Sequence, residues 1–447
     1  MINRILLTQL KQWAKEDDRK PLVLRGARQV GKTTLVNDFA SEFDVYLKLN
    51  LDIPSECRLF EEFEEVHTLV DAIYILNSQQ KKDGSTLLFI DEIQNSAKAV
   101  AMLRYFYEEF KWLHVITAGS LLESLLDRNI SFPVGRVEYM AIHPCSFIEF
   151  LNGIGESFDQ NLIESLSVVG VHGRIMQHFK NFVVIGGMPA VIKKFAERRD
   201  VLACDKIYDS LIAAYSDDVE KYAHNTTMMQ IVRFLITEGW RYAGSPISFE
   251  RFGGTNYRSR EVGEAFRLLE KTMLLELVYP TTSTHLPLLA SKTRKPKLIW
   301  FDTGIVNYVA GVRKEVFSAT DIQDVWRGSI AEQIVAQELI SLETRVTKHR
   351  QYWVRAKDQS SAEIDFIIEY QGRAIPIEVK SGHNAKLKSL HLFMDQAPHD
   401  IAVRVWSQPL SVNIVRTQQG KEFRLINVPF YYVCVLEKVL DKIINNK

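Results

Sequence analysis

Residues 26 to 33 read Gly26-Ala27-Arg28-Gln29-Val30-Gly31-Lys32-Thr33 and are followed by Thr34. The stretch fits the pattern G-x-x-x-x-G-K-[ST] and lies between an apolar run, Leu22 to Leu24, and a segment of helical character. Glycines at this spacing let backbone N–H groups surround phosphates, the lysine reaches the β and γ oxygens, and the Thr33 hydroxyl binds magnesium. The sequence therefore predicts a strand, a phosphate-binding loop over residues 26–34, and a helix.

Two adjacent carboxylates follow a second apolar run. Leu87 to Ile90 is typical of a buried strand in a parallel sheet, and Asp91 and Glu92 come directly after it. At the carboxyl edge of the sheet, Asp91 would hold magnesium through water and Glu92 would polarise the water that attacks the γ-phosphate. An acidic pair after a strand also occurs at helix N-termini and in solvated turns. Beside a phosphate loop, the catalytic interpretation is the stronger one.

A third apolar run, His114 to Thr117, leads to Ser120. A polar side chain at this strand tip could sense the γ-phosphate. Ser120 is also followed three residues later by Glu123, which is the spacing of a helix capping box. The sequence leaves both roles open.

Composition sets outer bounds. A chain of 447 residues predicts about two to four domains, and its 46% of hydrophobic residues can form sizeable cores. The 55 basic and 55 acidic residues cancel, so nucleic acid or a membrane would have to be bound by a local patch. Residues 2–13 fit an amphipathic helix, and no run is long enough to span a bilayer. The four cysteines lie far apart, which argues against a zinc site or disulfide framework and favours a cytoplasmic protein: Cys57, Cys145, Cys204 and Cys434.

The order of patterns predicts four regions. Strand-like and helical stretches alternate over residues 1–155, which is typical of a three-layer α/β unit. Residues 156–245 read as a helical connector, and residues 246–320 as helix, turn, helix and strand, the outline of a winged helix. Residues 321–447 form the last region. The basic run from Lys292 to Lys297 is interpreted as a solvated loop.

DNA contact by the winged-helix-like region is one of two readings. Its second helix, residues 258–271, carries four basic residues that could contact phosphates. The same helix carries Glu261, Glu264 and Glu270, whose charges repel phosphates. A structural or protein-binding role therefore stands beside the DNA role.

The last region holds a second group of chemical residues. Residues 362–368 and 374–380 read as two strands of a hairpin, which places Asp365 near Glu378 and Lys380. Two converging carboxylates suit magnesium, a lysine can activate water against a phosphodiester, and Glu332 on a helix could add a further acid. Cross-strand salt bridges in an ordinary hairpin are the alternative.

The chain resembles the bacterial and archaeal AAA-type ATPases whose C-terminal domain of unknown function has a restriction-endonuclease-like core. The resemblance rests on segments spread over nearly the whole chain: Arg28–Thr33, Phe89–Gln94, Gly119–Ser120, Gly135–Arg136, Pro144–Phe147, Lys297–Gly304 and Ile377–Gly382. It implies ATP and Mg²⁺ as ligands of a site that contains Lys32, Thr33, Asp91, Glu92 and Ser120. It also implies that Arg136 approaches the γ-phosphate in cis or from a neighbouring subunit, with a structural salt bridge as the alternative.

The C-terminal part of the resemblance concerns a nuclease signature. Asp365, Glu378 and Lys380 match its D…E-x-K pattern, and Glu332 matches its helical acid. Three functions are compatible with these observations. The first is an ATPase coupled to a DNA-binding or effector module, the second an ATP-regulated metal-dependent DNA nuclease, and the third an ATP-switched signalling or scaffold protein. A homo-oligomer fits the AAA resemblance, but no sequence pattern sets the number of subunits.

Overall fold

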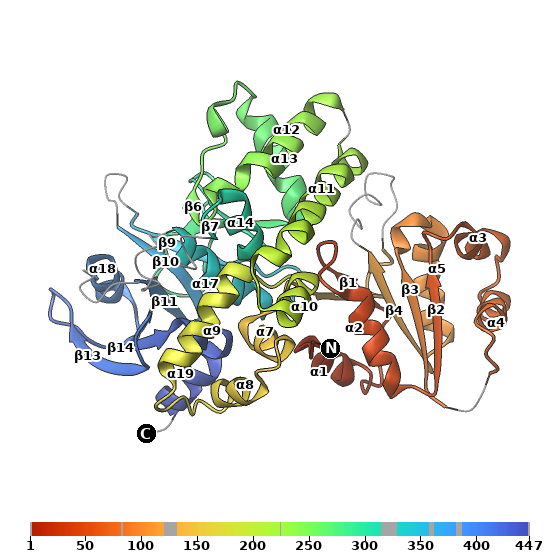
Figure 1. The fold of residues 1–447 in the computed structure, drawn as a ribbon, viewed down its shortest axis with the longest axis horizontal. Helices are drawn as coiled ribbons and strands as arrows, with labels where there is room; N and C mark the ends of the chain where they lie inside the picture. The colour runs from red at the N-terminus through yellow and green to blue at the C-terminus, as the bar shows by residue number, and fades with distance from the viewer. Residues whose placement is uncertain are drawn as a thin grey trace.

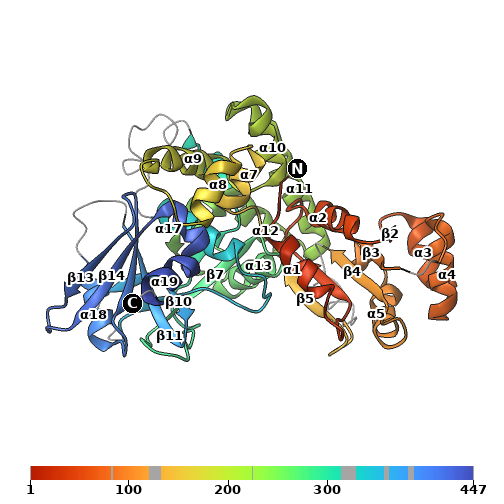
Figure 2. The ribbon, with the colours of Figure 1, turned by 90° about the horizontal axis from the view of Figure 1, so that it is seen from below.

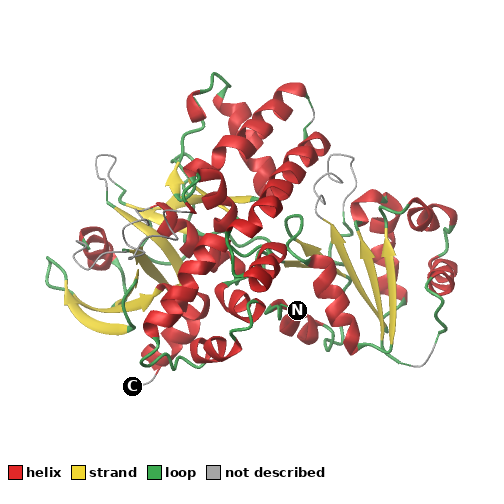
Figure 3. Ribbon diagram, in the orientation of Figure 1, coloured by secondary structure: helices red, strands yellow, loops and turns green. Residues whose placement is uncertain are grey.

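The computed structural model describes residues 2–81, 84–119, 132–223, 225–313, 329–356, 362–380 and 387–445. An N-terminal α/β unit and a C-terminal sheet lie at opposite ends of the molecule, and helices fill the space between them (Figures 1 and 2). Coloured by secondary structure, the two sheets are seen as separate layers among the helices (Figure 3).

The N-terminal sheet has five parallel strands in the order β2-β3-β4-β1-β5. The strands are β1 Leu22–Arg25, β2 Val45–Asn50, β3 Thr86–Asp91, β4 Leu113–Gly119 and β5 Glu138–Ala141. Every residue of β3 is buried, as expected for a strand with neighbours on both sides and helices on both faces. The prediction of an α/β unit with a parallel sheet is confirmed, and β5 is the strand that the sequence did not reveal.

Helices cover both faces of this sheet. Leu22 and Leu24 pack toward one hydrophobic core and Val23 toward another, because successive side chains of a strand point to opposite faces. The first face carries α1 Leu6–Trp13, α2 Lys32–Phe39 and the turn η1 Ala40–Glu42. The second face carries α3 Pro54–Glu62, α4 Val66–Leu76, η2 Ile93–Asn95 and α5 Ala97–Glu109.

The middle of the chain is helical. It contains α7 Phe147–Gly153, α8 Ser157–Glu164, α9 His172–Ile185, α10 Pro189–Arg198, η3 Leu202–Cys204, α11 Asp205–Tyr222, α12 Thr226–Glu238 and η4 Gly239–Tyr242. Their apolar faces share one core with the first face of the N-terminal sheet and with the C-terminal sheet. The two ends of the molecule are therefore joined by continuous packing. Within the described part, every helix is too short or too polar to span a bilayer.

The C-terminal sheet has nine strands in the order β13-β14-β12-β11-β10-β9-β7-β8-β6. They are β6 Ser245–Pro246, β7 Leu275–Thr281, β8 Lys297–Trp300, β9 Gln351–Val354, β10 Glu363–Tyr370, β11 Arg373–Val379, β12 Ile401–Trp406, β13 Ser411–Arg416 and β14 Glu422–Pro429. The remaining elements pack around it: η5 Phe252–Gly254, α13 Ser259–Lys271, α14 Thr303–Ala310, α17 Ser329–Ser341, α18 Lys388–Gln396, η6 Phe430–Val435 and α19 Leu436–Asn445.

One strand pair crosses the boundary that the sequence predicts at residue 320. β7 pairs in parallel with β9, so strands from the winged-helix-like region and from the last region belong to one sheet. The sequence pattern could not reveal this, because the partner strands are some seventy positions apart, as in the pairing of Tyr279 with Gln351. The winged-helix and endonuclease-like assignments stay predictions.

Candidate functional site

The phosphate loop joins the end of β1 to the start of α2. Gln29 and Gly31 have φ angles of 64° and 98°, and such positive values turn backbone N–H groups toward the inside of the loop. Only glycine fits at position 26, because a Cβ there would lie 2.3 Å from the carbonyl oxygen of Ile142. The loop geometry is therefore set by backbone conformation and close packing.

The ammonium group of Lys32 lies inside this loop. Its Nζ donates hydrogen bonds of 2.9 Å to the carbonyl oxygens of both Gly26 and Ala27, and only 7% of the residue is exposed. Burial lowers the pKa of Lys32 to about 8, although the charges of Glu92 and Asp91 act in the opposite direction. A phosphate entering the loop would meet a preplaced donor.

Thr33 and Asp91 are brought together from α2 and β3. The Thr33 hydroxyl donates to Asp91 Oδ2 at 2.7 Å. Hydroxyl and carboxylate oxygens are ligands that Mg²⁺ prefers, so the side chains present fit the metal that a phosphate loop uses.

Glu92 lies directly beyond the end of β3. Its φ of 52° is uncommon for a residue other than glycine, and its carboxylate accepts a hydrogen bond from Gln94 Nε2. Burial raises the pKa of Glu92. Strained backbone at the tip of a strand is frequent at functional sites, and here it aims a carboxylate next to Asp91.

Two predicted residues are not brought to this site by the described structure. Ser120 lies outside the described residues. Arg136 precedes β5 and forms a 3.0 Å ion pair with Glu108 at the end of α5. The position before β5 lies at the amino-terminal edge of the parallel sheet, whereas the phosphate loop follows the carboxyl end of β1, at the opposite edge. The described structure thus has Arg136 in the structural salt bridge that the sequence left open as the alternative, away from the phosphate loop of its own chain, and a role from a neighbouring subunit stays a prediction.

Arg4 and Asp218, two residues that the sequence did not reveal as part of the site, hold the phosphate loop. Arg4 donates from Nη1 to the Val30 carbonyl at 2.8 Å and from Nη2 to the His143 carbonyl at 2.6 Å. The predicted loop residue Arg28 forms a 2.8 Å ion pair with Asp218 of α11. Single charged residues far from the loop in sequence give no local signal of such contacts.

A turn between α9 and α10 links the loop to the other half of the molecule. A Cβ on Gly31 would lie 3.6 Å from Cγ of Pro189, so the first residue of α10 lies close to the phosphate loop. Asp302, two residues after β8, accepts hydrogen bonds from the N–H of Gly187 at 2.6 Å and of Ile305 at 2.9 Å. Burial raises the pKa of Asp302 to about 6, and these N–H donors act against that rise.

The predicted acids of the last region also meet. Asp365 on β10 and Glu378 on β11 each lie one residue from the Phe366–Ile377 pair of an antiparallel hairpin. Lys380 forms a 2.9 Å ion pair with Glu378. Burial, and then the charge of Asp365, raise the pKa of Glu378 to about 7 and that of Glu332 to about 8.

Lys297 lies at the centre of these acids, and the interpretation of its basic run as a solvated loop is wrong at this residue. It begins β8 and is fully buried, with Nζ 2.7 Å from Glu332, 2.6 Å from Glu363 and 3.4 Å from Asp365. Burial alone would lower the pKa of Lys297, but the three carboxylates raise it above its ordinary value. The apolar residues that follow, Leu298 to Trp300, were the available signal for a buried strand.

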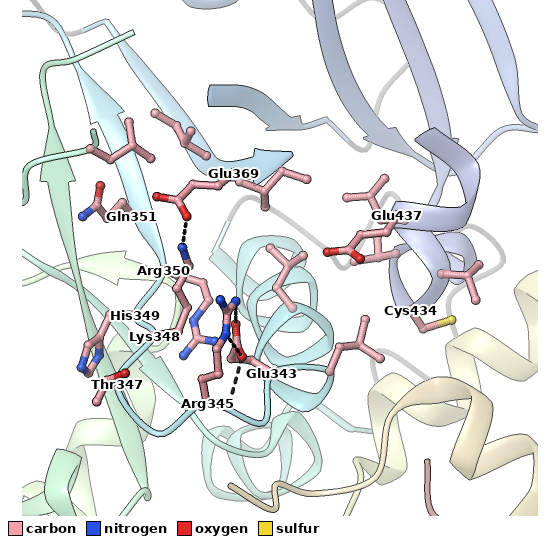
Figure 4. Close-up of a pocket in the computed structure, with 18 of the residues that line it drawn as sticks. Glu343, Arg345, Thr347, Lys348, His349, Arg350, Gln351, Glu369, Cys434 and Glu437 are labelled. Atoms are coloured by element: carbon pink, nitrogen blue, oxygen red, sulfur yellow. Dashed lines mark hydrogen bonds and ion pairs between the residues drawn. The ribbon is translucent and has the colours of Figure 1, made fainter. Parts of the chain in front are cut away.

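The larger of two described cavities, about 690 Å³, lies at neither cluster. It is lined by β9, β10, the end of α17 and the start of α19 (Figure 4). Two of its basic side chains pair with acids, Arg345 with Glu343 and Lys348 with Glu369. These ion pairs reduce the charge that the two side chains offer to a ligand.

Comparisons with known proteins support the nature of the N-terminal unit. Residues 18–151 match the family described as an AAA domain, and residues 176–316 and 327–431 match two domains of unknown function (DUF8612 and DUF4143). No curated protein matches the chain.

Solved structures are similar to this chain at low identity and low TM-score. The Walker-type ATPase paby2304 of Pyrococcus abyssi is 12% identical, with 69% of this chain and 96% of that chain covered and a TM-score of 0.42. The Aeropyrum pernix ORC1 protein in complex with DNA is 12% identical, with 69% and 93% covered and a TM-score of 0.27. These likenesses carry no inference about what this chain binds.

The parallel sheet, the phosphate loop and the acidic strand define a P-loop nucleotide-binding unit. With the family match, residues 18–151 form an AAA-type ATPase domain.

Proposed function

We propose that the chain binds and hydrolyses ATP and passes its nucleotide state to the C-terminal sheet. The observation that carries the ATPase part is the contact between Thr33 and Asp91, beside Lys32 within its loop and Glu92 at the strand tip. Phosphoryl transfer depends mainly on positioning and charge stabilisation, and these four side chains supply both.

Each side chain has one role in this proposal. Lys32 exchanges its bonds to backbone carbonyls for bonds to phosphate oxygens. Thr33 and Asp91 would hold Mg²⁺, which when bound neutralises charge on the phosphates. Glu92 orients the attacking water and accepts its proton, and burial favours this because a raised carboxylate pKa makes a better base.

Nucleotide binding and phosphate release by matched variants test the ATPase proposal. Lys32→Ala should lose ATP binding, and Glu92→Gln should bind ATP without turning it over. Lys48→Ala, a half-buried lysine of β2, serves as the control and should retain both activities. Unchanged turnover in either of the first two variants would refute the assignment.

Coupling to the C-terminal sheet is supported by the position of β8. Lys297 at the start of this strand lies among the acids of the last region, and Asp302 just beyond its end accepts a hydrogen bond from Gly187, in the turn that leads to Pro189 beside the phosphate loop. A shift of the loop on hydrolysis therefore has a short path of packed backbone to the sheet.

We further propose that α13 contacts nucleic acid. Arg260, Arg267 and Lys271 are exposed on one face of the helix with Glu264 between them. Cations on one face favour phosphate contact, which depends steeply on salt. The triple alanine variant should bind duplex DNA more weakly and with a smaller salt slope, whereas Glu264→Gln should bind more tightly. Equal binding by all three proteins would favour a structural or protein-binding role for α13.

The nuclease and the signalling alternatives differ in what they require of the last region. A metal-dependent nuclease needs Asp365 and Glu378 to hold a divalent cation, whereas a switch or scaffold does not. The two alternatives therefore differ in whether the acids around Lys297 hold a divalent cation.

A further inference from the structure

The acids around Lys297 direct oxygens to its ammonium group. Asp365 accepts a 2.7 Å hydrogen bond from the N–H of Val379 through Oδ2, and its Oδ1 faces Lys297 Nζ at 3.4 Å. Glu332 and Glu363 each direct one oxygen to the same Nζ, at 2.7 and 2.6 Å. A divalent cation that joined these three carboxylates would need the position that the ammonium group occupies.

Lys297 is held in this position by several independent contacts. Its backbone lies in the sheet, paired with Val278 of β7 and with Pro246 of β6. Its Nζ lies 4.9 Å from the centre of the Tyr352 ring and 5.9 Å from that of Phe366, at distances where aromatic rings attract cations. Withdrawal of the ammonium group would leave the buried Asp365 and the half-buried Glu332 and Glu363 without their common cation, which is unfavourable.

We infer that the ammonium group of Lys297 is the built-in counter-ion of Glu332, Glu363 and Asp365, and that it excludes a divalent cation from among them. The three acids around Lys297 therefore do not fit a divalent cation. Glu378 is paired with Lys380 and has one oxygen without a hydrogen-bond partner in the described part of the chain. A cation held between Asp365 and Glu378 would have to share the Asp365 carboxylate with the ammonium group of Lys297.

The cluster of Lys297 with Glu332, Glu363 and Asp365 links elements of the fold. Lys297 joins β8 to α17 through Glu332 and to β10 through Asp365 and Glu363, so one buried cation links three elements. The cluster then has a structural role, and the exclusion of a divalent cation from among Glu332, Glu363 and Asp365 disfavours the nuclease alternative. The inference goes beyond the ATPase proposal and does not depend on it.

Counting bound Mn²⁺ on the nucleotide-free full-length chain by equilibrium dialysis tests the inference. The proteins are the wild type, Asp365→Asn, Lys297→Met, the double variant, and Lys295→Met as a control from the exposed part of the same basic run. Any Mn²⁺ bound at Thr33 and Asp91 is bound by all five proteins, so it does not affect the differences between them. Asparagine at position 365 keeps a side-chain oxygen that can accept the hydrogen bond from the Val379 N–H.

Wild type, Asp365→Asn and Lys295→Met should bind the same number of ions. Lys297→Met should bind one more per chain, and the double variant should lose it. The inference is overturned if the wild type binds one ion more than Asp365→Asn, or if a folded Lys297→Met gains none. Should circular dichroism show that Lys297→Met does not fold, the comparison of wild type with Asp365→Asn decides alone.

Discussion

Replacing Asp302 by alanine tests the link between the two halves of the molecule. The carboxylate accepts from Gly187 N–H and, as the N-cap of α14, from Ile305 N–H, in a site that is fully buried. Loss of a cap costs about 1 kcal/mol, and a buried N–H without a partner costs about 1–3 kcal/mol. These two losses together should lower the free energy of unfolding by about 2–4 kcal/mol. For a domain of about 150–250 residues this lowers Tm by roughly 5–15 °C.

The same substitution should also change ATP binding. Because the turn that Asp302 holds leads into Pro189, which lies close to the phosphate loop, we expect a several-fold rise in the KM for ATP with a smaller change in kcat. Scanning calorimetry and phosphate release measure the two effects. Asp302→Asn, which keeps one acceptor oxygen, should be intermediate, and Asp400→Ala, an exposed aspartate, should change neither. An unchanged KM despite a lowered Tm would refute the coupling, and an unchanged Tm would refute the energetic reasoning as well.

Three further predictions each concern one side chain: Glu338, Asp218 and Gln94. Burial raises the pKa of Glu338 from 4.5 to about 8, so its contribution to stability is fully present below pH 4.5 and is lost as pH rises through 8. The Tm of the wild type should therefore fall between about pH 4.5 and 8 relative to Glu338→Gln, and parallel curves would contradict this. Asp218→Asn removes the ion pair with Arg28 of the phosphate loop and should raise the KM for ATP by roughly fivefold, corresponding to about 1 kcal/mol; a normal KM in titrated phosphate-release assays would show that the pair is dispensable. Gln94→Ala frees the Glu92 carboxylate and should lower kcat by about tenfold at unchanged KM, so a wild-type kcat would exclude a positioning role.

The nucleotide-binding half was largely predictable from sequence. The spacing of Gly26, Gly31 and Lys32 and the apolar run before Asp91 are local signals, since a phosphate loop is formed by consecutive residues and a buried parallel strand is continuously apolar. The structure has these elements where the pattern predicts them, with Thr33 bonded to Asp91.

Other features of that half escaped prediction. The ion pair of Arg28 with Asp218 joins residues 190 positions apart, and no local pattern specifies such a contact. Arg136 was assigned from its neighbour Gly135, but its place at the amino-terminal edge follows from the parallel direction of β5, which the sequence does not reveal.

The sequence by itself determined the phosphate loop, the acidic strand and the pairing of Asp365 with Glu378 across a short hairpin, because each depends on neighbours along the chain. Tertiary structure alone decided that β7 joins β9 in one sheet and that Lys297 is a buried counter-ion. The physical reason is that a lysine in a basic run is solvated or buried according to its partners. Those partners come from α17 and β10, far along the chain, and only folding brings their carboxylates to it.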